Sequence, residues 1–187
     1  MNLEKFRPAL YLSSAYKVDY EALWREGIRG ILFDIDNTLF PYYVPHATNE
    51  AKALIDKLKK MGFKVGILSN GRSERVQLLK QEFGMEGVSR AAKPLRFGAF
   101  RMKKTLGLPA SQIALIGDQI FMDVLCANRM GFKSILTVPI DPVNDEKSVM
   151  KRRGAERKII SRLNLYPEDL QEAGNSDEDK AIPRKAD

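Results

Sequence analysis

The sequence predicts an α/β domain in which helices cover both faces of a parallel sheet. Short apolar runs alternate with longer amphipathic stretches along most of the chain. Such an alternation of strands and helices is typical of parallel α/β sheets. The apolar runs also lack the in-and-out polar pattern of a half-exposed strand, which indicates burial on both faces. We therefore expect a Rossmann-like, doubly wound parallel sheet in a single domain.

The expected elements follow one another in regular order. Strands are expected over 29–34, 63–70, 86–94, 112–118 and 132–139, the third being short and running into a loop. Helices are expected over 49–62, 72–84, 95–107 and 120–131. Apolar residues recur at helical spacing in these segments, and Gly62 and Gly84 suit the ends of the first two helices.

The two ends of the chain differ from this pattern. We expect residues 1–27 to form an N-terminal lead-in segment before the catalytic domain, with a short helix over 20–27 that Asp19 caps. The expected catalytic domain spans 28–165 and ends in a basic helix whose charged face we expect to be solvated. Residues 166–187 are polar and acidic and predict a disordered tail.

Composition narrows the function only partly. The chain has 187 residues and a net charge of +7, but residues 168–187 carry seven acids and three bases, so the rest carries +11. A basic protein surface attracts phosphorylated ligands, nucleic acid or an anionic membrane. Alternatively, the basic residues form a solvated surface without a specific ligand. One cysteine, Cys126, excludes an intrachain disulfide and favours a reducing, cytoplasmic compartment. We expect neither a membrane span nor a signal peptide.

Polar side chains follow the apolar runs at the points where the strands end. The residues expected at this edge are Asp34, Asp36, Ser69, Asn70, Lys93, Asp118 and Asp123. In open α/β sheets, ligands bind at the carboxyl ends of the strands. These side chains, distant in sequence, are therefore expected to converge.

The chemistry of this set is coherent. Clustered carboxylates of Asp34, Asp118 and Asp123 suit a hard cation, Mg²⁺ above all. A lysine, a hydroxyl and exposed backbone amides suit a phosphoryl group, whose transfer needs mainly positioning and charge neutralisation. A carboxylate can also act as the nucleophile.

Four short motifs carry a resemblance to a known family. The stretches "DIDNT" at 34–38, "LSN" at 68–70, "KP" at 93–94 and "GDQIFMD" at 117–123 occur in order, each after an expected strand. They resemble the four motifs of the haloacid dehalogenase (HAD) superfamily, and most closely subclass IIIA and its YqeG-type family. That family is related to phosphatidylglycerophosphate phosphatases. One departure is Met122, where the family often has threonine.

The resemblance implies roles for the first motif. Asp34 would be the nucleophile that accepts the phosphoryl group and also a ligand of Mg²⁺. Asp36 would be the general acid and then the general base, with its backbone carbonyl on the metal, and Thr38 would support the loop. Because dehalogenases of the superfamily lack the second acid, Asp36 favours phosphate chemistry.

The remaining motifs imply binding roles. Ser69 would donate to the phosphoryl oxygens, with Asn70 nearby, and Lys93 would neutralise charge on both the nucleophile and the phosphoryl group. Asp118 would ligate Mg²⁺, and Asp123 would help to hold the metal site. A merely supporting position for Asp123, and a helix-capping role for Ser69 and Asn70, remain alternatives.

The spacing of the motifs leaves no room for a substantial cap domain. Only 33 residues separate Asp36 from Ser69, and 24 separate Ser69 from Lys93. We expect an open site, which favours a large or membrane-presented substrate or a partner subunit, so the oligomeric state stays open.

The family relation implies a lipid phosphate as substrate and a peripheral place at the inner face of the membrane. The basic stretch 151–162 and the apolar residues Phe6, Leu10, Tyr11 and Leu12 are candidates for resting on anionic lipid. The alternatives are a soluble phosphate ester, a phosphoprotein, or a non-enzymatic binding module on the same fold. We expect no nucleic-acid partner for the enzyme.

Overall fold

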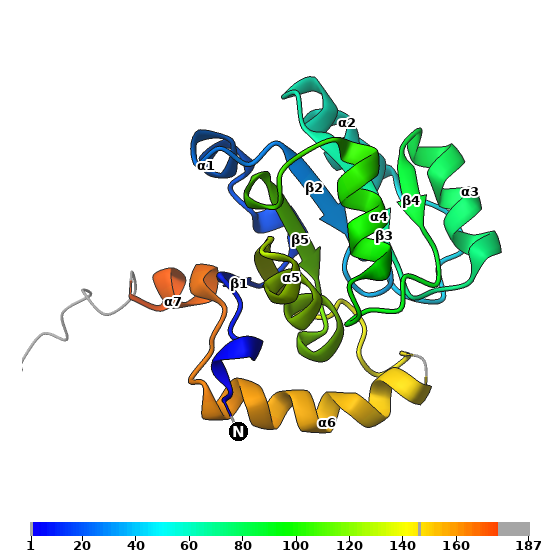
Figure 1. The fold of residues 1–187 in the computed structure, drawn as a ribbon. Coiled ribbons are helices and arrows are strands. Elements are labelled where there is room, and N and C mark those ends of the chain that lie inside the picture. Colours follow the sequence, from blue (N-terminus) through cyan, green and yellow to red (C-terminus); the bar gives the residue numbers. More distant parts are fainter. Residues whose placement is uncertain (1, 146, 176–187) are drawn as a thin grey trace, which may run out of the picture.

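Six parallel strands form the centre of the computed structural model, which describes residues 2–145 and 147–175. The strands are β1 (Leu10–Leu12), β2 (Gly30–Phe33), β3 (Lys64–Leu68), β4 (Glu86–Val88), β5 (Ile113–Gly117) and β6 (Lys133–Thr137). Their spatial order is β1-β6-β5-β2-β3-β4, so the chain winds outward from β2 to β4 and then returns to β5 on the other side. The predicted doubly wound sheet is confirmed, and its switch point lies between β2 and β5 (Figure 1).

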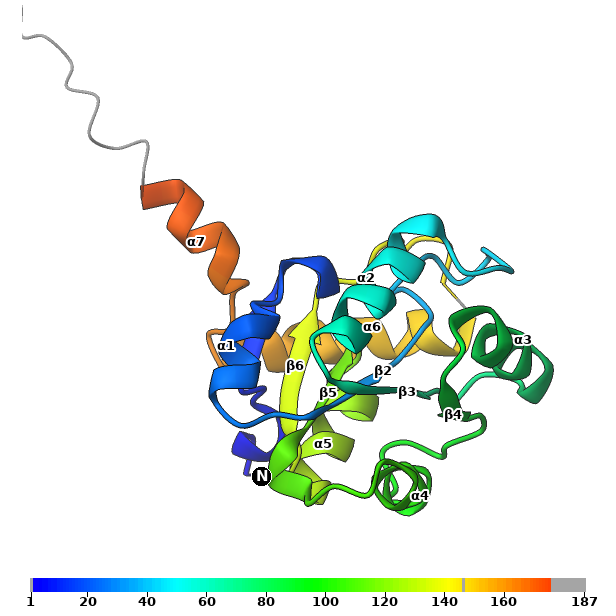
Figure 2. The ribbon, with the colours of Figure 1, turned by 90° about the horizontal axis from the view of Figure 1, so that it is seen from above.

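Helices cover both faces of this sheet (Figure 2). The helices are α1 (Tyr20–Arg25), α2 (Asn49–Lys60), α3 (Ser73–Phe83), α4 (Phe97–Leu106), α5 (Leu125–Met130), α6 (Lys147–Arg162) and α7 (Glu168–Asn175). Helices α1, α2 and α3 bury their apolar residues against one face, and α4 and α5 against the other. A π-helical turn, Ile120–Val124, precedes α5.

Strand β2 shows why the apolar runs are continuous. Ile31 and Phe33 pack with α1, α2 and α3, whereas Leu32, between them, packs with α4 and α5. All three side chains are fully buried. Since successive side chains of a strand point to opposite faces, both faces need apolar residues, and the strand pairs with β3 and β5 along its length.

The N-terminal residues belong to the core, which corrects their expected place on a membrane. Residues 10–12 form the edge strand β1, which pairs in parallel with β6. Phe6 and Leu12 are buried, and Leu10 and Tyr11 pack partly buried against core clusters. Phe6 and Leu12 are therefore not available to lipid, and Leu10 and Tyr11 expose only part of their surface. Asp19 caps α1 through the backbone amide of Ala22, as predicted.

The C-terminal part also differs from expectation. Residues 168–175, expected within a disordered tail, form α7, and residues 176–187 lie outside the described part of the chain. Acids in the first turn favour a helix start, and they have partners on the N-terminal segment. The carboxylate of Asp169 accepts the backbone amide of Ser13 at 2.8 Å, and that of Glu168 accepts the amide of Tyr11 at 3.3 Å.

No cap domain interrupts the described residues between the motifs, as predicted, but the site is less open than expected. Helix α6 runs across the carboxyl end of the sheet (Figure 1) and supplies part of a pocket wall. The spacing of the motifs could not reveal this, because α6 follows all of them. Among the described helices, none has the length and apolar character needed to cross a membrane.

Two glycine substitutions test the packing of the helices. A Cβ on Gly98 in α4 would lie 2.6 Å from the carbonyl oxygen of Ala91, whereas a Cβ on Gly154 in α6 meets nothing within 4 Å. We expect Gly98→Ala to lower the free energy of unfolding by about 1–3 kcal/mol through overpacking. Gly154→Ala should raise it by about 0.5–1 kcal/mol, since alanine favours the helix. Urea unfolding measures both, and equal effects would contradict this packing.

Candidate active site

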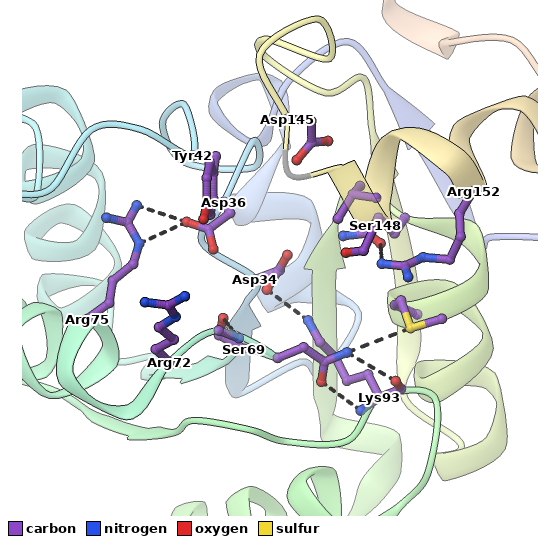
Figure 3. A pocket seen from close by; sticks show the side chains of 15 residues that line it. Asp34, Asp36, Tyr42, Ser69, Arg72, Arg75, Lys93, Asp145, Ser148 and Arg152 are labelled. Carbon is purple, nitrogen blue, oxygen red and sulfur yellow. Dashed lines mark hydrogen bonds and ion pairs between the residues drawn. The ribbon is translucent and has the colours of Figure 1, made fainter.

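Most of the predicted residues line one pocket at the carboxyl ends of the strands (Figure 3). The pocket has a volume of about 580 Å³. Five of the predicted side chains line it: Asp34, Asp36, Ser69, Asn70 and Lys93. The other two, Asp118 and Asp123, are buried beside Asp34, and one oxygen of each of the three carboxylates lies within 4.8 Å of the others. The convergence expected from the strand ends is therefore present.

Lys93 joins two of the buried carboxylates. Its Nζ lies 2.8 Å from Oδ1 of Asp34 and 2.6 Å from Oδ1 of Asp123, and all three side chains are almost fully buried. Burial alone would lower the pKa of Lys93, but the charges of Asp123 and Asp34 raise it above its ordinary value. The lysine is thus a fixed cation at the floor of the pocket.

Asp123 owes its position to a turn in the backbone. The π-helical turn brings it back over the end of β5, where its Oδ2 accepts the amide of Gln119 at 3.0 Å. A Cβ on Gly117 would lie 2.3 Å from its Cγ, so only glycine leaves room for the carboxylate there. Both oxygens of Asp123 therefore already accept a hydrogen bond from the protein.

Asp118 has a partner that the motifs did not reveal. Arg153, from α6, forms an ion pair with the carboxylate of Asp118 and donates to its backbone carbonyl at 2.9 Å. The same guanidinium lies 2.7 Å from Asp145 and 3.6 Å from Glu156. Burial raises the pKa of Asp118 well above its ordinary value, and Arg153 opposes that rise. The expectation that the charged face of the basic helix is solvated is therefore wrong for Arg153, which is buried in ion pairs.

The second acid of the first motif has its own arginine. Nε of Arg75, in α3, donates to Oδ1 of Asp36 at 3.0 Å (Figure 3). Burial and the neighbouring charge of Asp34 raise the pKa of Asp36 to about 6, although Arg75 lowers it. Asp36 can therefore exist in either protonation state near neutral pH, which suits a group that gives and takes a proton.

Ser69 and Asn70 shape the loop after β3. The hydroxyl of Ser69 accepts the amide of Gly71 at 3.0 Å, and the Asn70 side chain exchanges hydrogen bonds with the backbone of Lys93 at 2.8 and 3.1 Å. Neither residue caps α3, whose N-cap is Arg72. Asn70 instead fastens the Lys93 loop to β3.

The donor set fits a hard divalent cation. Three carboxylates converge, and hard cations prefer oxygen ligands. Lys93 contacts Oδ1 of Asp34 and leaves its Oδ2 for a cation, whereas Arg153 contacts Oδ2 of Asp118 and leaves Oδ1 with only a long hydrogen bond. Thr38 donates to the other oxygen of Asp118 at 3.4 Å. A cation bound here would meet a preformed set of ligands.

Sequence reasoning missed the arginines because their role depends on distant partners. Arg153 and Glu156 do carry a local signal, since they share one helix face with the buried residues Val149 and Ile159. Charged residues at core-facing positions of a helix indicate buried pairing. Arg75 carries no comparable signal.

One substitution tests the buried pairing. Arg153→Ala would leave buried carboxylates without their cation, and removing one partner of a buried ion pair costs about 3–5 kcal/mol. We expect the free energy of unfolding to fall by about that amount in metal-free buffer. The exposed Arg157 on the same helix is the matched control, and Arg157→Ala should stay within about 0.5 kcal/mol. Equal losses in chemical unfolding would contradict the assignment.

Comparisons with known proteins agree with this geometry. The family model described as haloacid dehalogenase-like hydrolase matches residues 45–131. "Probable phosphatase YqeG" of Bacillus subtilis (strain 168) is 32% identical over 158 residues, covering 84% of this chain and 91% of that protein. "Phosphatidylglycerophosphate phosphatase 1, chloroplastic/mitochondrial" of Arabidopsis thaliana is 28% identical over 154 residues, covering 78% of this chain and 44% of that protein.

A solved structure supports the fold alone. An uncharacterized protein from Listeria monocytogenes serotype 4b superposes with a TM-score of 0.51 at 19% identity, covering 64% of this chain and 84% of that one.

The extent of the match to the Bacillus subtilis phosphatase decides the family. With its α/β fold and four motifs in order, this chain belongs to the haloacid dehalogenase-like hydrolases and is a phosphatase.

Proposed function

We propose that the chain hydrolyses a phosphomonoester with Mg²⁺, through an aspartyl-phosphate on Asp34, and that its substrate is phosphatidylglycerophosphate or a close lipid phosphate. One observation supports the chemistry above the others. Asp34 and Asp36 line the same pocket as Ser69 and Lys93, while the carboxylates of Asp34, Asp118 and Asp123 converge beside it. The phosphatidylglycerophosphate phosphatase of Arabidopsis thaliana supports the substrate.

The first step uses the two acids of the first motif. An oxygen of Asp34 attacks phosphorus and forms a new P–O bond while the bond to the leaving alcohol breaks. Protonated Asp36 gives its proton to the oxygen of the leaving alcohol, so the alcohol leaves as a neutral molecule. The 2.8 Å contact with Lys93 fixes the direction of the Asp34 carboxylate, and the lysine lowers the charge that builds up on the phosphoryl oxygens.

The second step returns the enzyme to its start. Asp36, now ionised, takes a proton from water, the water oxygen attacks phosphorus, and the bond to Asp34 breaks to release inorganic phosphate. Ser69 lines the pocket, and its hydroxyl would donate to a phosphoryl oxygen. Asp34, Asp118 and the backbone carbonyl of Asp36 would hold the Mg²⁺, which supplies charge neutralisation, and Asp123 supports it by holding Lys93.

Hydrolysis assays with two substitutions test the mechanism. Asp34→Asn should lower phosphate release from an aryl phosphate by about a thousandfold or more, since it removes the nucleophile. Asp36→Asn should lower it by about 10²–10⁴-fold, the usual contribution of general acid–base catalysis. The exposed Asp56 of α2 provides the control Asp56→Asn, which should be fully active. Full activity of Asp34→Asn would exclude the aspartyl-phosphate.

The substrate is tested in parallel with phosphatidylglycerophosphate in mixed micelles. Lipid turnover that disappears in Asp34→Asn would support the lipid substrate. Turnover of the aryl phosphate alone would keep the chemistry and replace the lipid by a soluble ester or a phosphoprotein. Activity on neither, with Mg²⁺ and folded protein present, would favour a binding module on this fold.

Metal binding can be measured without turnover. A ligand that binds only the folded state at one hundred times its Kd stabilises it by about 2.7 kcal/mol. We therefore expect Mg²⁺ to raise the Tm of the unmodified chain by several degrees, and Asp118→Asn to abolish most of that rise because it removes a ligand. Asp56→Asn should keep the full rise. An equal response of both variants in a thermal-shift titration would place the cation elsewhere.

A further inference from the structure

Exposed apolar side chains gather beside the pocket, on the loop before α4 and on α4 itself. Leu95, Phe97 and Phe100 are 52%, 76% and 53% exposed. Together with Arg96 and Arg129 they line a groove of about 870 Å³. We call these five residues the α4 patch. Single exposed apolar residues need no explanation, but a contiguous group with its own groove is typical of an interaction surface.

Packing within the protein does not account for the patch. Helix α4 buries a different set of residues, Ala99, Met102 and Leu106, against the sheet. Its outward residues could therefore be polar without loss to the core. Phenylalanine on this outward face points to a partner that is itself apolar.

The charge around the patch indicates what kind of partner this is. Residues 87–117 contain no Asp or Glu and six Lys or Arg residues. One of these, Lys93, is buried in the active site, and the other five are Arg90, Arg96, Arg101, Lys103 and Lys104. Within the described chain none of these five, nor Arg129, forms an ion pair. Aromatic residues interspersed with uncompensated basic ones match an anionic lipid surface, which attracts each such charge by about 1 kcal/mol.

The patch begins on the loop that carries the active-site lysine. Leu95 is two residues from Lys93, and Arg129 donates to the backbone carbonyl of Pro94 at 3.0 Å. Other exposed apolar residues, Tyr43 at 60% and Val143 at 75%, lie on the loops that follow β2 and β6, which end at the same edge of the sheet. Loops at the edge of the sheet where the pocket opens therefore also expose apolar side chains.

We propose that the α4 patch binds the surface of a lipid bilayer that contains anionic lipid, and so holds the pocket next to lipid-borne phosphate. The aromatic rings enter the interface between headgroups and acyl chains, and the arginines contact the headgroup phosphates. This role replaces the one first expected of Phe6 and Leu12, which are buried. The link to a lipid substrate rests on the proposed function, whereas the binding itself does not.

Vesicle sedimentation with the full chain tests the proposal. The vesicles are phosphatidylcholine alone or an equimolar mixture of phosphatidylcholine and phosphatidylglycerol, at physiological salt. We expect binding to the mixed vesicles and at least about tenfold weaker binding of Phe97→Ser/Phe100→Ser, given the apolar area that each ring would bury. Arg96→Gln/Arg129→Gln should weaken binding to the mixed vesicles and reduce its dependence on salt.

The matched control replaces two exposed apolar residues by serine outside the α4 patch. Tyr166 and Leu170 are 61% and 57% exposed, before and on α7, and Tyr166→Ser/Leu170→Ser should bind vesicles like the unmodified chain. The Phe97→Ser/Phe100→Ser variant should hydrolyse an aryl phosphate at the unmodified rate, which shows that it is folded. Its hydrolysis of phosphatidylglycerophosphate in vesicles should fall in proportion to binding.

The outcomes separate the two proposals. Equal vesicle binding by the unmodified chain and Phe97→Ser/Phe100→Ser, or no binding by the unmodified chain, would overturn the α4 patch even if aryl phosphate is hydrolysed. Concentration-dependent dimerisation that Phe97→Ser/Phe100→Ser abolishes, without vesicle binding, would assign the patch to a second copy of the chain and overturn the proposal too. Vesicle binding through the patch without any phosphatase activity would uphold the patch and reject the proposed function.

Discussion

The balance of charge beneath the pocket is the constraint on which the rest of the site depends. Two buried cations, Lys93 and Arg153, face a larger number of buried carboxylates, namely Asp34, Asp118, Asp123, Asp145 and Glu156. Buried carboxylates without compensation are costly, and burial accordingly raises the pKa of Asp118. These two cations are too few to neutralise the cluster, and a divalent cation would supply most of the missing positive charge. The same deficit is what would favour a metal ion at the three converging carboxylates.

The sheet and two helices bring these charges together from distant parts of the chain. Strands β2 and β5 are neighbours, so Asp34 and Asp118 leave the sheet side by side. The π-helical turn after β5 folds Asp123 back toward them, and the missing side chain of Gly117 makes room for it. Helix α6 then lays Arg153 against Asp118 from outside the sheet. These contacts depend on one another, because removing one charged side chain leaves its buried partner without a counter-charge, which is costly in free energy.

The sequence was informative where function depends on local pattern and silent where it depends on contacts between distant segments. Strand ends with polar residues predicted the convergence of Asp34 and Asp118, because parallel strands share one carboxyl edge. Apolar runs alone could not tell that Leu12 adds an edge strand to β6 or that Arg153 faces inward, since both depend on packing partners 125 or 35 residues away in the chain. The wall that α6 adds to the pocket was missed for the same reason.

The basic residues therefore form two groups, which differ in how strongly salt screens their charges. Lys93 and Arg153 are buried in ion pairs, where solvent ions screen little, so their effect on the carboxylates should persist at high salt. Arg96, Arg129 and the other exposed bases around α4 act through solvent, and their attraction for anions fades with ionic strength. Salt should consequently weaken the approach of an anionic surface while leaving hydrolysis of a small soluble phosphate nearly unchanged. Under the role proposed for the α4 patch, the charges that serve the chemistry and those that would bind a membrane differ in burial, and therefore in their response to salt.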